Sequence, residues 1–184
     1  MAVGPSYATE TVRILPDSVS FVAALLVEFP EFASAAFHPR EGTLRLTLLV
    51  GRRLPAPSRV RFARRVEDAV AVLHDLEGGP PPRVEVRWQV GPNFTRFDLV
   101  RSVDDLTVEE VRVVAQLARD SFGSDLLAGE ERGLEEGREE ELRYALEHAR
   151  QLRPSRPVVG LREGGKVLVY YAPRTARRVR EPVP

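Results

Sequence analysis

The segment RVEVRWQV (83–90) alternates strictly between apolar side chains and charged or polar ones. In an extended chain its valines and Trp88 fall on one side, and its arginines, glutamate and glutamine fall on the other. The turn residues GPN (91–93) follow, and after them comes a second strand-like run, FTRFDLV. This pattern predicts a β-hairpin whose apolar side faces a core, and it places Trp88 in that core.

Three further segments have the pattern of strands. TVRIL (11–15) and GTLRLTLLV (42–50) alternate, and VVGLREGGKVLVYY (158–171) has a Gly-Gly turn between two apolar runs. Within the last of these, GLREGGK (160–166) matches the first seven positions of a phosphate-binding loop. That loop next requires Ser or Thr and then a helix, whereas here Val167 and a strand former follow. The sequence therefore predicts a hairpin and not a nucleotide site.

Four helices are expected between these strands. The second carries an apolar stripe at helical spacing, and the third opens with the capping box TVEE (107–110). After Pro30, the run EFASAAF is expected to add a further turn or two to the first helix. The expected ranges are 17–28 with Asp17 as the N-cap, 58–76, 107–123 ending at Gly123, and 138–153.

The resulting order, β-α-β-α-β-β-α-α-β-β, predicts a two-layer α+β sandwich in which a mixed sheet carries helices on one face. The length of the chain, 184 residues, is compatible with one domain and an extension. We expect an α/β domain over residues 1–104, a helical extension over 105–173 that ends in a β-hairpin, and a flexible tail over 174–184.

Composition excludes several classes of site. The chain of 184 residues has no cysteine, which removes disulfides, zinc–thiolate and iron–sulfur centres, and thiol nucleophiles. The longest apolar run, 21–27, is too short to span a membrane, and the first residues lack a signal-peptide pattern, so a cytoplasmic location is expected. His38, His74 and His148 have no metal-binding spacing and are expected at the surface or its boundary. The sequence predicts no catalytic residue, no cofactor, no metal site and no small-molecule substrate.

Net charge is zero, but the charges are segregated along the chain. The stretch RRLPAPSRVRFARRV (52–66) has six arginines and no acid, whereas 130–141 is acidic and the tail is basic. All but one of the 27 basic residues are arginine, which is typical of a GC-rich genome and weakens a nucleic-acid interpretation. A solvated face is therefore favoured, and the acidic segment and the basic tail predict self-association. The candidate interaction residues are Arg52, Arg53, Arg61, Arg64, Arg65, Tyr170 and Tyr171.

Residues 12–90 resemble the alkaline-shock-protein family of small bacterial α/β domains. The resemblance is carried by the strand LRLTLLVG, Pro55 shortly after Gly51, the helix VRFARRVEDAVAVLHDL and the strand VEVRWQV. The chain departs from the family pattern at the end of this helix, where it reads HDLEGG. The resemblance implies a non-enzymatic cytoplasmic protein linked to envelope stress and self-assembly, and it supplies no catalytic residues.

These observations lead to the expectation of a non-enzymatic cytoplasmic interaction or scaffold protein with a stress-related role. The alternative is an RNA- or ribosome-associated protein of the KH type, which would use the basic face at 52–65. KH domains clamp the nucleic-acid backbone with a G-x-x-G loop, and no such loop lies between the expected helices.

Overall fold

The computed structural model describes residues 18–80, 82–129, 137–151 and 156–172. The strand expected at 11–15 and the Asp17 cap lie outside these residues. The elements in chain order are α1 (Ser18–Glu28), β1 (Ser34–His38), β2 (Thr43–Val50), α2 (Ala56–Leu76), β3 (Glu85–Val90), β4 (Thr95–Ser102), α3 (Val108–Phe122), a 3₁₀ turn η1 (Gly123–Asp125), α4 (Arg138–Gln151), β5 (Val158–Glu163) and β6 (Lys166–Tyr171).

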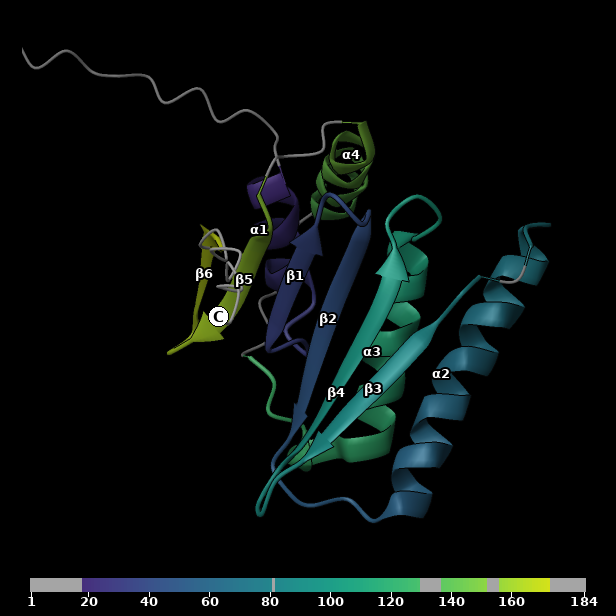
Figure 1. Ribbon diagram of the computed structural model, residues 1–184, viewed down its shortest axis with the longest axis vertical. Coiled ribbons are helices and arrows are strands. Elements are labelled where there is room, and N and C mark those ends of the chain that lie inside the picture. Colours follow the sequence, from purple (N-terminus) through teal and green to yellow (C-terminus); the bar gives the residue numbers. More distant parts are fainter. Residues whose placement is uncertain (1–17, 81, 130–136, 152–155, 173–184) are drawn as a thin grey trace, which may run out of the picture.

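The strands form one six-stranded sheet in the order β3-β4-β2-β1-β5-β6 (Figure 1). This confirms the α+β sandwich. The expectation of a mixed sheet is wrong, because every neighbouring pair is antiparallel. Three of these pairs are hairpins with short connections. The connection through α2 makes β3 parallel to β2, but β4 lies between these two strands and is antiparallel to both. The connection through α3 and α4 reverses the chain direction, so β5 is antiparallel to β1.

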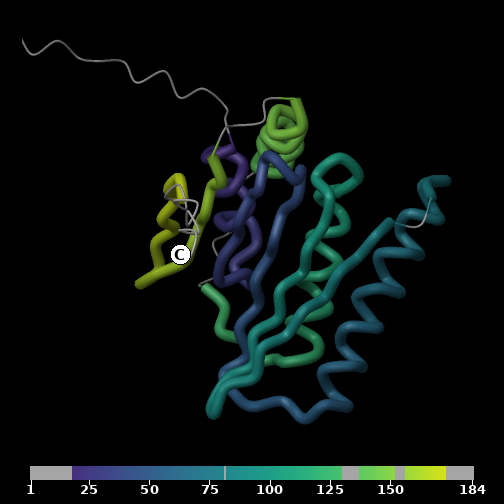
Figure 2. The backbone as a smooth tube through the Cα atoms, in the orientation of Figure 1, coloured from purple at the N-terminus to yellow at the C-terminus, as the bar shows by residue number. Residues whose placement is uncertain are grey.

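The helices pack against one face of the sheet and leave the other face open, as Figures 1 and 2 show. On the covered face Leu46 pairs with Ala35 on β1 and Leu99 on β4, and all three side chains are buried. A single apolar cluster runs from α1 to β5. Among the described residues, no helix combines the length and the apolar character that crossing a membrane requires.

The run EFASAAF shows where local pattern and tertiary structure disagree. It does not extend the first helix, because residues 34–38 form strand β1 between β2 and β5. Ala35 and Phe37 are fully buried on the covered face of the sheet. Alanine favours a helix intrinsically, but pairing on both edges and burial of Phe37 outweigh that preference.

The residues predicted to begin or end helices and to form the last hairpin turn do so largely as expected. The Thr107 hydroxyl accepts a hydrogen bond from the Glu110 N–H at 3.2 Å, and Gly123 ends the helix with a φ of 50°. The reciprocal half of the capping box is replaced by an inward contact of the Glu110 carboxylate, described below. Gly164 and Gly165 have φ values of 55° and 74°, as a tight hairpin turn requires, so the hairpin prediction for 158–171 is confirmed.

Candidate functional site

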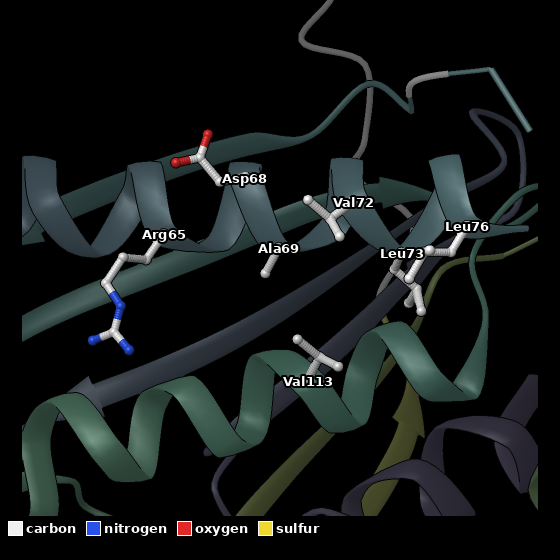
Figure 3. A pocket seen from close by; sticks show the side chains of 7 residues that line it. All are labelled: Arg65, Asp68, Ala69, Val72, Leu73, Leu76 and Val113. Carbon is white, nitrogen blue, oxygen red and sulfur yellow. The ribbon is translucent and has the colours of Figure 1, made fainter.

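An apolar groove of about 470 Å³ runs between α2 and α3 on the helical side of the molecule (Figure 3). Along α2 its lining passes from Arg65 and Asp68 to the apolar end of the helix, and Val113 of α3 forms the opposite wall. Val72 and Leu76 are 58% and 79% exposed, which is unusual for large apolar side chains that neighbour one another on one helix. The remaining lining residues are Ala69 and Leu73.

A buried polar cluster fixes the separation of the two helices that form the groove. The Glu110 carboxylate of α3 contacts Arg101 of β4 through Oε1 at 2.5 Å and Oε2 at 3.0 Å, and Oε2 lies 3.0 Å from Nε2 of His74 on α2. These three side chains are at most 8% exposed. Because a buried charge is costly unless it is paired, the cluster selects one position of α2 on α3.

His74 therefore corrects the sequence-based expectation, since it is buried and not at the surface. Its position on α2 falls on the side that faces α3, where Glu110 supplies a partner. His38 and His148 are half-buried, as residues of a boundary are. Within the described ranges, no three His, Asp or Glu side chains gather as a metal site.

The groove continues toward the N-terminal half of α2 into a second depression of about 240 Å³, lined by Arg52, Arg61 and Arg65 among others. Arg65 lines both hollows and donates from Nη1 to the Ser121 hydroxyl at 3.1 Å. Arg52 pairs with Asp125 at 2.5 Å. Three of the five predicted arginines thus lie at one end of the groove, where Asp120 and the Asp125 partner of Arg52 offset part of their positive charge.

The other predicted residues are not brought to this surface. Arg53 and Arg64 are exposed but line neither hollow. Tyr170 and Tyr171 lie on β6, at the opposite edge of the sheet from β3, with 46% and 40% of their area exposed. The two rings face opposite sides of the sheet, as strand alternation requires, and Arg156 lies over the Tyr171 ring at 5.6 Å.

Trp88 is a second correction, because it is 41% exposed and not a core residue. It does face the helical side, where its ring meets Phe97 edge to face at 6.5 Å and Arg59 at 5.8 Å. However, β3 is an edge strand, and α2 lies beside it without covering it fully (Figure 1).

The acidic segment and the basic tail that predict self-association fall mostly outside the described residues, which resume at Gly137 and end at Ala172. The described part of the acidic segment is the first turn of α4. There the Glu139 carboxylate accepts from Arg112 at 2.6 Å and from Arg143 at 2.5 Å. These hydrogen bonds and the nearby positive charges hold the pKa of Glu139 below its ordinary value, so this carboxylate is already engaged within its own chain.

Comparisons with models of protein families, with curated proteins and with solved structures find no match for this chain.

Proposed function

We propose that this chain is a cytoplasmic, non-enzymatic interaction protein that associates with a second copy of itself through the face formed by α2 and α3. The observation that carries the proposal is the exposure of Val72 and Leu76 beside an apolar groove. Burying each of these side chains in an interface contributes about 1.5–3 kcal/mol, which is a substantial share of the free energy of a weak dimer.

Charge complementarity favours a second copy over an unrelated partner. The first half of α2 is basic at Arg61, Arg64 and Arg65, whereas its second half carries Asp68 and Asp75. When two identical helices meet antiparallel across a two-fold axis, the basic half of each faces the acidic half of the other. The same helix therefore supplies both sides of the contact, with the apolar residues near the axis. Resemblance to a self-assembling family points in the same direction.

Sedimentation velocity over a range of protein concentrations tests this proposal. We expect wild-type dimers that dissociate as salt is raised, because the charge contacts lie at the rim of the interface and are screened. The double variant Val72→Ser/Leu76→Ser is expected to be monomeric. Val60→Ser is the matched control, because Val60 is also exposed on α2 but projects about 120° or more away from the groove side.

A charge exchange identifies the partner. Arg65→Glu should weaken the dimer, because position 65 of one copy and Asp75 of the other would then both be negative. Arg65→Glu/Asp75→Arg should restore the dimer, because each of these contacts again joins a negative side chain with a positive one. A wild type that stays monomeric at the highest concentration overturns the proposal. So does a Val72→Ser/Leu76→Ser variant that assembles like wild type.

RNA binding is a second candidate function, supported by the exposed Arg53, Arg61 and Arg64, for which no ion pair is found within the described part of the chain. Against it, Asp120 lines the same depression as Arg61, and Asp125 neutralises Arg52. Titration of labelled RNA at two salt concentrations separates the two functions. Salt-sensitive binding that Arg53→Glu/Arg61→Glu abolishes would favour RNA, because each phosphate contact releases counterions.

A further inference from the structure

The open face of the sheet carries a second hollow, on the opposite side of the molecule from the α2–α3 groove. Its volume is about 290 Å³, room for about ten water molecules. The strand register places Val100 of β4 at its floor, flanked by Arg45 of β2 on one side and Glu85 of β3 on the other. Two strand spacings, about 10 Å, separate the residues of β2 and β3 that form its walls.

Four arginines and three carboxylates line this hollow, and two of the arginines have no ion-pair partner in the described part of the chain. Arg87 is paired with Glu85 at 2.6 Å, and Arg101 is paired with Glu110 beneath the sheet and with Asp105 at 3.5 Å. Arg45 and Arg83 also line the hollow, and no hydrogen bond or ion pair of either guanidinium is found within the described part of the chain. Two cationic side chains thus remain available to a ligand.

Two buried nitrogen atoms at the hollow reinforce this conclusion. Nε of Arg45 and Nε2 of His38 are shielded from solvent, yet neither has a hydrogen-bond partner in the described structure. Buried polar atoms are nearly always satisfied, and an atom that is not calls for an explanation such as an absent ligand. Arg45 and His38 come from the adjacent strands β2 and β1, where Thr43 pairs directly with His38.

The arginines of the hollow stabilise the negative charge of the one carboxylate that lies among them, Glu85. The hydrogen bond from Arg87 and the positive charges of Arg87, Arg83 and Arg45 hold the pKa of the Glu85 carboxyl below its ordinary value. Glu41 and Asp105 also line the hollow and add negative charge to it. These carboxylates disfavour an extended polyanion, which would contact more of them than a small oxyanion held at Arg45 and Arg83.

We propose that this hollow binds the oxyanion group of a small molecule, a phosphate or a carboxylate, held by the guanidinium groups of Arg45 and Arg83 with His38 as a further donor. Arginine suits this task because its planar fork donates two parallel hydrogen bonds to such a group.

Isothermal titration calorimetry with inorganic phosphate tests the site. The chloride concentration is lowered as phosphate is added to the buffer, so that the ionic strength stays constant. Saturable binding by wild type is expected, and Arg45→Gln and Arg83→Gln should each weaken it about tenfold by removing a charge-assisted hydrogen bond. Arg64→Gln is the matched control, because it removes an exposed arginine of α2 on the other side of the molecule. Succinate in place of phosphate distinguishes a carboxylate site from a phosphate site.

A second measurement keeps the test informative if a variant fails to fold. In wild type, phosphate or succinate should shift the ¹H–¹⁵N resonance of the Arg45 Nε–H, which has no partner in the free protein. The proposal is overturned if neither anion binds saturably, if the Arg45 resonance does not move at saturation, or if Arg64→Gln weakens binding as much as Arg45→Gln does.

Discussion

At the scale of single residues, the buried contact of Glu110 with Arg101 and His74 has the largest expected effect on stability. Its members come from α3, β4 and α2, and Arg101 also donates to the Arg83 carbonyl at 2.7 Å. Arg101 therefore links the end of β4 to α3 and to the segment before β3, and Glu110 extends the network to α2 through His74. A contact of this kind selects one arrangement, because displaced neighbours would leave a charge buried without a partner.

Removing one partner tests this role. We expect Arg101→Met to lower the free energy of unfolding by about 3–5 kcal/mol, because Glu110 would remain buried without its cation. The double variant Arg101→Met/Glu110→Leu should regain part of this loss, since no uncompensated charge remains. Urea unfolding followed by circular dichroism measures both. A loss below about 1 kcal/mol for the single variant would show that water reaches Glu110 and replaces the arginine.

At the scale of elements, α1 packs closely on β5. A Cβ atom on Gly160 would lie 2.6 Å from Cγ1 of Val22 and 2.7 Å from Cδ1 of Leu26, which is closer than atoms in contact allow. Glycine is thus required at this strand position by the approach of the helix and not by its own backbone conformation.

Gly160→Ala should accordingly destabilise the fold by about 1–3 kcal/mol, the usual range for overpacking a core. Gly79→Ala is the control, because its added Cβ would meet its nearest neighbour at an ordinary 3.5 Å. That variant should leave the stability unchanged or raise it by up to about 1 kcal/mol. Thermal unfolding of the two proteins side by side gives the comparison, and equal midpoints would mean that α1 moves away from β5 at little cost.

The elements also show what could be predicted from the sequence. Long periodic segments such as α2, and the Gly-Gly turn of β5–β6, have strong local signals and form as expected. The β1 strand was missed because five residues of SAAFH become a strand through their neighbours on both edges.

The candidate site could be predicted in part, for a similar reason. The arginines of α2 are evident from composition, but the groove is not. Val72 and Leu76 lie outside the apolar stripe that the sequence predicts for this helix, which consists of Phe62, Val66, Val70 and Leu73. Trp88 matches a core pattern, but its strand lies at an edge of the sheet. Which helix lies beside which strand is a property of the tertiary structure. The periodicity of apolar residues, 3.6 in a helix and 2 in a strand, identifies the elements but does not predict which of them become neighbours.

At the scale of the whole molecule, the two proposed sites are separated by the sheet itself. The α2–α3 groove lies on the helical layer, and the oxyanion hollow lies on the open face above β2, β4 and β3. Their lining residues do not overlap. One network connects the two sites, because Arg101 of the hollow contacts Glu110, which holds α2 through His74. This network is buried and selects one arrangement, so we expect a small coupling free energy and independent self-association and anion binding.

This independence gives a further prediction. The monomeric variant Val72→Ser/Leu76→Ser should bind phosphate with the affinity of wild type when both are titrated calorimetrically under the same conditions. Conversely, Arg45→Gln should sediment as wild type does. A large change in phosphate affinity on dissociation would mean that the second copy contributes to the hollow, and the interface would then have to include the open face.

The packing of α1 on β5 has a consequence for synthesis on the ribosome. This helix precedes every other described element, yet it packs on α4 and β5, which lie near the other end of the sequence. The β2–β4 and β3–β4 ladders can form while the chain is still growing, but Phe21, Val22 and Leu26 have no complete cover until the last hairpin emerges. The nascent protein therefore exposes an apolar helix for most of its synthesis, and this helix is a natural binding site for a chaperone.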